Sequence, residues 1–511
     1  MGNLNMNWLK PLSGRSIPWF WIGMAGVFLL AAGLRFWGLN RFNTLVFDEA
    51  YYAKYGNNYL THTFFADAHP PLGKYLIAIG IWLSNLNPFG GAMQNRLTGS
   101  PLSPVSYRWM NALTGSLIPF VVAGIAYQLS HRRSYALVAA LFTAADGLLL
   151  VESRYALINI YLLLFGLLGQ WFFLLALNCE ARRRRFLLAL AGICFGAAIA
   201  VKWNGLEFLL GIYLIWLCAW VVRLFSSLRS PATDSALSVS ESVPSLPRLS
   251  EPPTLLQNLT RLSPLHLLID LGIVPALVYR LLWIPHLQLN PVLGFWTIHK
   301  LMLTYHQYSG KGSQEHPYCS VWYTWPWMIR PVRYFYEAHH LPSSVASPGA
   351  SLAAGAEPVI YDVHGMGNPV LWWLSTVAIL LLLGMLTRKI TVWATTRQTI
   401  ASQCPVPFTQ AAEFGIALYL IVNYATNLLP WARVTRCLFL YHYMGAAVFA
   451  FLALAWLVDC WLRSYQYELR AVGVTVIFLI LLAFVFWLPV YLGLPLSLDG
   501  FQSRMWFHSW I

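Results

Sequence analysis

The sequence predicts an all-α polytopic membrane protein with about eleven transmembrane helices and two long loops on one side of the membrane. Two observations predict this class. Only 10% of the 511 residues are charged and 58% are apolar, whereas soluble domains carry about 25% charged residues. The apolar residues also gather in blocks of roughly 17–24, the length that crosses the hydrocarbon core of a bilayer. A soluble globular enzyme, a disordered protein and a fibrous protein are therefore excluded.

The apolar blocks predict the transmembrane spans in chain order. The expected spans are 18–38, 110–128, 134–151, 156–178, 186–202, 205–223, 265–286, 369–387, 411–429, 437–459 and 471–492. The first is expected to be a retained span, because Arg35 and bulky residues stand where a signal-peptide cleavage site needs small ones. Very short links join the third to the sixth span, so these helices are expected to be antiparallel neighbours.

Positive charge in the short links predicts the orientation. Arg182 to Arg185 form the densest cluster, and Arg132–Arg133 and Arg388–Lys389 fall on the same side. Positive residues in short loops prefer the cytoplasm. The N-terminus is therefore expected in the cytoplasm and the C-terminus on the outer side of the cell membrane. The long segments 39–109 and 287–368 are then extracytoplasmic.

The pattern of spans divides the chain into three parts. Residues 1–223 are expected to form an N-terminal transmembrane catalytic region with the first six spans, and 264–511 a C-terminal transmembrane region with the others. Between them, Ser and Pro dominate 224–263 and its apolar residues have no period, which predicts a disordered cytoplasmic linker.

Charge and cysteine content limit the partners. The net charge of +14 comes from short clusters between apolar blocks, so we expect contact with anionic membrane lipid and not with nucleic acid. The seven cysteines are scattered and none are paired as CxxC, so neither a disulfide framework nor a cysteine zinc site is expected. Four histidines of the second outer segment fit no compact ligand spacing, so no metal is expected.

Asp48 and Glu49 are the first candidates for catalysis. This acidic pair follows the first span and lies among aromatic residues. Neighbouring carboxyl groups in a partly dry site differ in proton affinity, and one can act as a general base. Taken alone, the pair equally fits hydrated side chains at the membrane interface. His69 and Lys74 follow on the same side, where Lys74 opens an apolar run.

Two further groups stand at the outer ends of spans. Arg154 carries a planar fork that binds phosphate oxygens in a bidentate way, although a snorkelling arginine fits the same position. Lys202 and Trp203 end the fifth span. They equally suit a snorkelling lysine beside an interfacial tryptophan.

Aromatic and basic residues also gather in the second half of the chain. Trp325 and Arg330 lie in the aromatic stretch 316–331, and Arg433 lies in 429–436. Such aromatic density suits stacking on sugar rings and equally suits the membrane belt. All the candidates fall on the extracytoplasmic side. That arrangement suits an enzyme whose substrate is held by a polyprenyl tail in the bilayer, with its phosphate and sugar at the surface.

Taken together and in order, these motifs resemble the protein O-mannosyltransferases, in particular the short bacterial type. The motifs are Phe47-Asp48-Glu49, His69-Pro70-Pro71-Leu72-Gly73-Lys74, Ser153-Arg154, Lys202-Trp203-Asn204-Gly205, Trp322 to Pro331, Gly367-Asn368-Pro369 and Leu429-Pro430-Trp431. The resemblance runs from residue 19 to the C-terminus. It implies a GT-C architecture with an extracytoplasmic active site. It also implies inverting transfer of mannose, without metal or other cofactor, from a polyprenyl-phosphate carrier to Ser or Thr hydroxyls of exported proteins.

The resemblance also assigns roles to residues. It implies that Asp48 is the base, that Glu49 positions acceptor or sugar, and that Arg154 holds the carrier phosphate. The further candidates for binding the carrier phosphate or the sugar are His69, Lys74, Lys202, Trp203, Trp325, Arg330 and Arg433.

The sequence departs from the family in two places and leaves two alternatives open. The segment 287–368 is too short for the sugar-binding repeats of eukaryotic members, and Asn159 stands where an aspartate is expected. A GT-C transferase with a lipid or glycan acceptor would share the donor chemistry. A transporter would place ionisable residues within spans, where only Asp146 and Arg280 stand out. Whether the chain acts alone or as an oligomer stays open.

Overall fold

The computed structural model describes residues 18–86, 93–229, 254–308, 316–340, 358–396 and 411–511. Ten helices in this part of the chain are long and apolar enough to cross a membrane. They are built from α1 (Trp19–Phe36), α4 (Pro104–Ser130), α7 (Asn159–Leu177), α8 (Ala181–Val201), α9 (Leu206–Arg229), the run α11 (Pro264–Leu268), α12 (Val274–Leu282) and α13 (Ile284–Leu289), α15 (Pro369–Thr396), α16 (Ala411–Leu428), α17 (Met444–Leu462) and α18 (Tyr467–Leu492). The chain is a multi-pass membrane protein.

The third expected span is the one that differs. It is broken into α5 (Arg133–Ala144) and α6 (Gly147–Glu152). Asp146 lies at the break, where its carboxylate accepts a hydrogen bond from the backbone N–H of Leu149 at 2.9 Å and so caps α6. All eleven expected spans are therefore helical, but neither piece of the third has the length of a continuous span.

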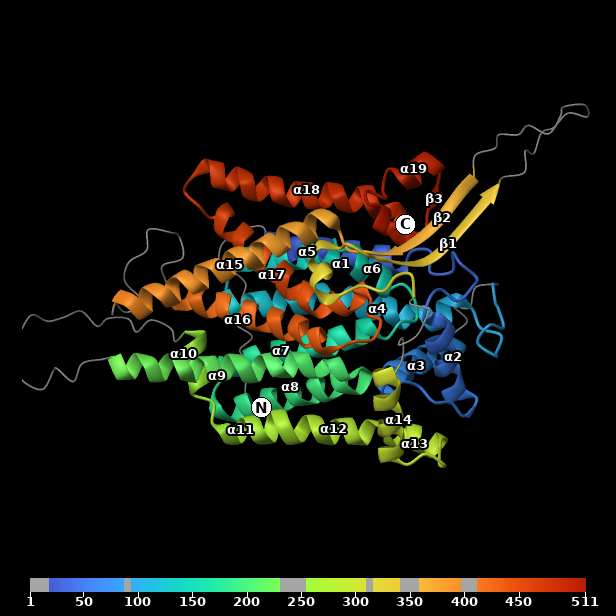
Figure 1. The fold of residues 1–511 in the computed structure, drawn as a ribbon, viewed down its shortest axis with the longest axis horizontal. Helices are drawn as coiled ribbons and strands as arrows, with labels where there is room; N and C mark the ends of the chain where they lie inside the picture. The colour runs from blue at the N-terminus through green and yellow to red at the C-terminus, as the bar shows by residue number, and fades with distance from the viewer. Residues whose placement is uncertain (1–17, 87–92, 230–253, 309–315, 341–357, 397–410) are drawn as a thin grey trace, which may run out of the picture.

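The long helices run side by side as a bundle, with α17 inside it (Figure 1). Almost every residue of α17 from Met444 to Asp459 is buried. α18, by contrast, turns an apolar face outward, with Phe478 and Val485 more than 60% exposed. A helix that is apolar all round and exposed on one face is typical of the lipid boundary of a membrane protein.

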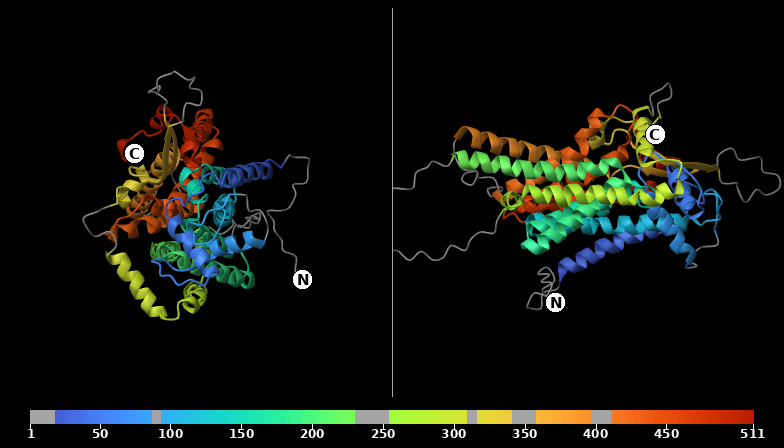
Figure 2. Two further views of the ribbon diagram at one scale, coloured as in Figure 1. Left: turned by 90° about the vertical axis from the view of Figure 1, so that its right-hand side faces the viewer. Right: turned by 90° about the horizontal axis from the view of Figure 1, so that it is seen from below.

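The segments outside the membrane lie together at one end of the bundle (Figures 1 and 2). They comprise α2 (Glu49–Leu60), α3 (Leu72–Leu86), α14 (Phe295–Tyr308), the 3-10 turn η4 (Trp322–Trp327) and α19 (Leu498–Gln502). A three-stranded antiparallel sheet accompanies them, in the order β1 (Val332–His340), β2 (Pro358–Gly365) and β3 (Pro495–Leu496). The expected helical membrane fold is thus confirmed, with this one small sheet added to it.

The ends of the expected linker are ordered helices. Residues 224–229 continue α9, and α10 (Leu255–Thr260) begins at a capping box formed by Thr254 and Gln257. The expectation of disorder is therefore wrong for 224–229 and 254–263, because the box satisfies backbone N–H groups at the start of α10. The rest of the linker, 230–253, lies outside the described residues.

Candidate active site

Asp48 lies at the first turn of α2, after a loop that leaves α1. The preceding residue, Phe47, has a φ of 53°, a left-handed conformation that is strained for a bulky side chain. Its ring stacks on Tyr334 of β1 with the centroids 4.2 Å apart. Gly365 of β2 makes room for this pair, because a Cβ there would meet the Tyr334 ring at 2.6 Å. The sheet thus fixes the turn that carries Asp48.

The environment of Asp48 makes it suitable as a base. Burial raises the pKa of its carboxyl to about 6, against the opposing effect of the Lys202 ammonium, and Asp67 raises it further. The side chain is half-buried. A carboxylate with a pKa close to neutrality takes up a proton far more readily than an ordinary aspartate.

Glu49 has a different environment from its neighbour. It is completely buried and pairs with Arg108 through two hydrogen bonds of 2.8 Å. Its two oxygens also accept the backbone N–H groups of Val46 and Ala156, each at 2.9 Å. With both oxygens occupied, the structure does not place Glu49 where it could touch acceptor or sugar.

Lys202 lies in the link between α8 and α9, close enough to Asp48 for their charges to interact. Its Nζ donates a hydrogen bond to Oδ1 of Asn159 at 2.8 Å, and it lies 5.4 Å from the ring centre of Tyr441. It interacts with the charges of Asp48 and Glu152. Burial lowers the pKa of Lys202 to about 8. The expected role of Lys202 in the site is thus consistent with its position.

Glu152 and Asn159 complete this group of charges. Glu152 is completely buried, and it accepts a hydrogen bond from the Tyr334 hydroxyl. The side-chain amide of Asn159 donates to Glu152 at 3.2 Å while its oxygen accepts from Lys202. An amide can bridge a carboxylate and an ammonium in this way because it carries both a donor and an acceptor. A charged role at position 159 is therefore unnecessary.

A second ion pair borders the site on the side of α3. Lys74 pairs with Asp67 and donates to the carbonyl of His69 at 2.7 Å. The ring of His69 lies 5.4 Å from that of His306 on α14. Burial, and then the charge of Lys202, hold the pKa of His69 well below its usual value, so its ring is neutral. Lys74 therefore orders the loop that carries His69. Its positive charge is balanced by the carboxylate of Asp67.

Arg436 is a second cation at the site. It lies in the loop between η5 (Leu429–Arg433) and η6 (Leu440–Tyr443) and is half-buried. Its positive charge contributes to the lowered pKa values of Lys202, His69 and His306. Its described hydrogen bond goes to the carbonyl of Cys437 at 3.1 Å. No ion pair of the described residues includes it.

Arg154 does not lie in this pocket. It is 2% exposed, and its guanidinium donates to the carbonyls of Leu34 and Trp37 at 2.6 and 2.7 Å, beside further contacts to the same helix end. These are the unpaired carbonyls at the C-terminus of α1, where a positive charge is favourable. The phosphate role predicted for Arg154 is thus not supported by its position, because both terminal nitrogens of its guanidinium already donate to backbone oxygens.

We therefore expect Arg154→Ala to reduce stability and leave donor binding unchanged. The substitution leaves several buried carbonyls without partners, at about 1–3 kcal/mol for each unsatisfied group. The thermal midpoint of the purified protein should fall, while the KM for the donor stays within about twofold, since a twofold change is only about 0.4 kcal/mol. A large rise in donor KM at unchanged stability would return the phosphate role to Arg154.

Three other predicted residues make their contacts outside the charge cluster. Arg330 donates to the carbonyls of Pro317 and Ser509 and so holds the C-terminal segment. Arg433 is exposed at the end of η5. Trp325 is completely buried and packs on His442 with ring centroids 6.0 Å apart. Trp325 therefore has a packing role next to His442, and Arg330 and Arg433 lie outside the charge cluster.

Trp203 lies between the charge cluster and an apolar groove. Its indole donates to the Tyr279 hydroxyl at 2.9 Å, and its ring lies 5.7 Å from that of His306. A groove of about 610 Å³ runs between α8, α9 and α12, and an adjoining one of about 420 Å³ reaches Trp203. Both are lined by Leu206, Leu209 and Tyr213. An apolar path thus leads from the membrane boundary to the neighbour of Lys202.

The sequence contained several site residues to which no role was given. These are Asp67, Glu152, Asn159, His306, Tyr334, Arg436 and Tyr441. A signal existed for some: Glu152 adjoins Ser153-Arg154, and Arg436 shares a cluster with Arg433. Spacing in the sequence does not show which of the two arginines lies in the charge cluster, because that depends on how the loop folds. Among the described residues, no three His, Cys, Asp or Glu side chains are grouped as metal ligands.

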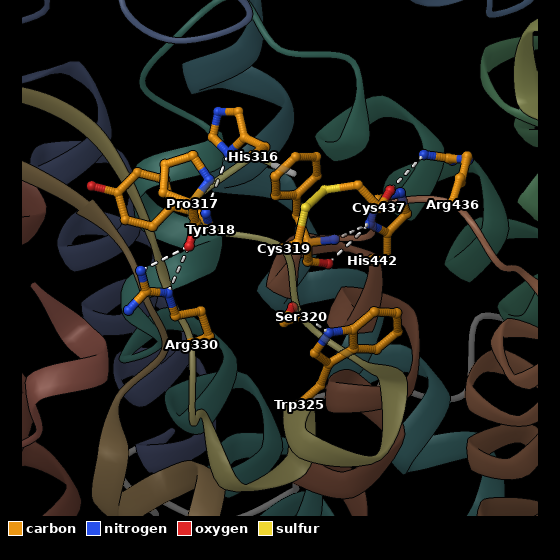
Figure 3. The surroundings of a disulfide bond; sticks show 11 residues. His316, Pro317, Tyr318, Cys319, Ser320, Trp325, Arg330, Arg436, Cys437 and His442 are labelled. Carbon is orange, nitrogen blue, oxygen red and sulfur yellow. Dashed lines mark hydrogen bonds between the residues drawn. A yellow bond between two sulfur atoms is a disulfide. The ribbon is translucent and has the colours of Figure 1, made fainter. Parts of the chain in front are cut away.

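A disulfide joins two of the segments at this end of the bundle. Cys319 and Cys437 are bonded across 118 residues of sequence (Figure 3). The other described cysteines, Cys179, Cys194, Cys218 and Cys460, are free. The absence of a disulfide framework was predicted from the scatter of the cysteines, and for this pair the prediction is wrong. Distance along the chain does not reveal which loops meet in the fold.

Comparisons with known proteins agree along most of the chain. Residues 25–240 match the family of dolichyl-phosphate-mannose-protein mannosyltransferases, and 292–510 match the C-terminal four-transmembrane region of protein O-mannosyltransferases. The polyprenol-phosphate-mannose–protein mannosyltransferase of Mycolicibacterium smegmatis is 24% identical, over 96% of this chain and 93% of that protein. Protein O-mannosyltransferase 1 of Drosophila melanogaster is 34% identical, over 38% of this chain and 22% of that protein.

The fold also matches a solved structure. The Pmt1–Pmt2 protein O-mannosyltransferase complex of S. cerevisiae, bound to its sugar donor, superposes with a TM-score of 0.74 over 98% of this chain and 93% of the matched chain, at 15% identity. This likeness confirms the expected GT-C fold. With two family regions in the expected order and relatives aligned along nearly its whole length, the chain belongs to the protein O-mannosyltransferase family.

Proposed function

We propose that this chain transfers mannose from a polyprenyl-phosphate carrier to Ser or Thr hydroxyls of exported proteins. The observation that carries the proposal is one arrangement. A carboxyl with a raised pKa, Asp48, interacts with the cation Lys202, and Lys202 in turn interacts with a second cation, Arg436, beside an apolar groove. The M. smegmatis and S. cerevisiae relatives are named for the same transfer and for binding a sugar donor.

Each part of this arrangement has a step in the reaction. Asp48 accepts the proton of the acceptor hydroxyl while the oxygen of that hydroxyl forms a bond to C1 of mannose. On the opposite face of the sugar the bond from C1 to the phosphate oxygen breaks, and the carrier phosphate leaves with both bonding electrons. The configuration at C1 is inverted. A phosphate leaving group needs charge stabilisation more than a proton, and Lys202 and Arg436 supply it from fixed positions.

We assign the remaining site residues to support. Glu152, Asn159 and Tyr441 hold Lys202, while Lys74 and Asp67 order the loop of His69. Glu49 acts on Asp48 through Arg108 and the backbone, and is therefore a positioning residue. The groove beside Trp203 has an apolar lining that suits a polyprenyl tail. Because cations are in place for the phosphate, we propose that no metal or other cofactor takes part.

We also propose that the site faces the extracytoplasmic side of the cell membrane. Arg182 to Arg185 begin α8, and Lys202 follows its last residue, so the arginine cluster and the site lie at opposite ends of one span. Positive clusters favour the cytoplasm. The Cys319–Cys437 disulfide joins the segment before η4 to the loop before η6, next to Arg436, and disulfides persist in oxidising compartments. The acceptor is then a protein in transit across the membrane.

Reconstitution tests this function directly. Purified protein is incubated with polyprenyl-phosphate-mannose and a Ser/Thr-rich peptide, with and without EDTA, and the peptide is analysed by mass spectrometry. We expect one hexose on a Ser or Thr at equal rates in both mixtures. Transfer to a lipid or glycan and not to the peptide would favour the alternative acceptor. Loss of activity in EDTA, restored by a divalent ion, would contradict the metal-independent mechanism.

The pH dependence of transfer should follow the two titrating groups. Asp48 accepts a proton only when ionised, so kcat/KM should fall as the pH drops through about 6. Lys202 stabilises the phosphate only when protonated, so activity should also fall above about pH 8. The profile is expected to be bell-shaped. Lys202→Arg, which stays charged, should remove the alkaline limb, and an alkaline limb that persists in this variant would assign it to another group.

A further inference from the structure

The Cys319–Cys437 disulfide adjoins the residue that we assign to the carrier phosphate. Cys437 directly follows Arg436, and the described hydrogen bond of the Arg436 guanidinium goes to the Cys437 carbonyl at 3.1 Å (Figure 3). The position of the charge therefore depends on the position of the Cys437 backbone. The disulfide fixes that backbone to a segment 118 residues earlier in the chain.

The partner segment around Cys319 is firmly held. Ser320 accepts a hydrogen bond from the indole of Trp325 at 2.8 Å, and Trp325 is completely buried. On the other side of Cys319, Arg330 donates to the carbonyl of Pro317 at 2.9 Å and 2.7 Å. Cys319 thus belongs to a platform that is fixed by a buried aromatic residue and an arginine.

The loop that carries Arg436 has weaker support of its own. Residues 434–439 are in neither helix nor strand. Besides the disulfide, the described backbone contact between this loop and the platform is one hydrogen bond, from Ser320 N–H to the Leu438 carbonyl at 2.8 Å. Arg436 is half-buried and has no ion pair among the described residues. A long, flexible cation loses binding energy when its backbone is free to move, because ordering it then costs entropy.

We propose that the Cys319–Cys437 disulfide is a positioning device for the reaction, which holds the Arg436 guanidinium in place for the phosphate of the lipid carrier. The proposal rests on the proposed function, in which Arg436 binds that phosphate. Neither cysteine touches the substrate. Their effect is exerted through one residue, and it acts on donor binding and not on the proton transfer to Asp48.

A double-mutant cycle tests whether the disulfide acts through Arg436. The variants are C319S/C437S, Arg436→Gln and the combination of all three, with Cys460→Ser as the control that removes a free cysteine. We expect C319S/C437S to raise the donor KM about tenfold, the equivalent of one lost charge-assisted hydrogen bond. Its kcat at saturating donor should change by less than about threefold, which is under 0.7 kcal/mol. Arg436→Gln should behave alike, and the triple variant should be no worse than Arg436→Gln alone.

Three results would overturn the proposal. They are a C319S/C437S variant with the wild-type donor KM, losses that multiply in the triple variant, and a loss confined to kcat. If C319S/C437S does not fold, the same comparison is made by reducing the folded wild-type and Arg436→Gln proteins with a phosphine. The wild-type donor KM should then rise, return on reoxidation, and stay constant in Arg436→Gln; any other pattern contradicts the proposal.

A binding measurement separates this proposal from the proposed function. The affinity of each variant for polyprenyl phosphate without sugar is measured beside transfer to the peptide. If the wild-type protein transfers mannose and C319S/C437S binds the carrier normally, the proposed role of the disulfide is contradicted and the proposed function is not. A wild-type protein that binds polyprenyl phosphate but transfers nothing contradicts the proposed function, whatever the cysteine variants do.

Discussion

Asp48→Asn is expected to reduce mannose transfer by about 10²–10⁴-fold, the usual contribution of a general base. Asparagine has nearly the same shape as aspartate but cannot accept the proton of the acceptor hydroxyl. Because Asp48 is half-buried and makes no ion pair among the described residues, the change should leave the fold intact. The initial rate of hexose transfer to the peptide at pH 7.5 measures the effect.

Two controls make the result specific to Asp48. Asp499→Asn changes an exposed carboxylate on α19, at the same end of the bundle, and should keep the wild-type rate. The thermal midpoint of Asp48→Asn should equal or exceed that of the wild-type protein, because the substitution removes the need to ionise a half-buried carboxyl. Near-normal transfer by a folded Asp48→Asn variant would show that another group, such as Glu152, takes the proton.

The sequence predicted the spans well, because a membrane imposes a single strong rule on the chain. Blocks of apolar residues with few charges must be helices, since unpaired backbone groups are not tolerated in lipid. The break in the third span depended on Asp146, whose carboxylate is satisfied by Leu149, Asn368 and Trp372. Two of these partners lie more than 200 residues away, so no local pattern could reveal why an aspartate is tolerated there.

The site was predictable in its location but not in its division of roles. Charges at the outer ends of spans indicated which face carries the chemistry. Local sequence did not show that the carbonyls at the end of α1 would occupy Arg154, nor that the loop after η5 would bring Arg436 beside Lys202. Likewise, the resemblance gave Glu49 a place beside acceptor or sugar, and only the position of Arg108 shows that its carboxylate is occupied by a buried ion pair.

The adjacent acids can be told apart by stability, since Glu49→Ala should unfold the protein rather than slow it. The substitution leaves the guanidinium of Arg108 buried without its counter-charge, which costs about 3–5 kcal/mol. Arg108 also donates to the carbonyls of Leu39, Phe42 and Thr44, so the loop that leads to Asp48 would lose its anchor. We expect little folded protein after extraction, and a thermal midpoint far below that of Asp48→Asn.

A second variant distinguishes a buried pair from a group that binds substrate. Replacing both partners, as in Glu49→Leu with Arg108→Met, removes the two charges together and should recover part of the stability lost in either single variant. Recovery of this kind is expected only if the two side chains act on each other. Glu49→Gln could instead keep the wild-type thermal midpoint while kcat falls 100-fold or more, which corresponds to about 2.7 kcal/mol in the transition state. That result would show that Glu49 contacts the reacting groups and that its assignment as a positioning residue is wrong.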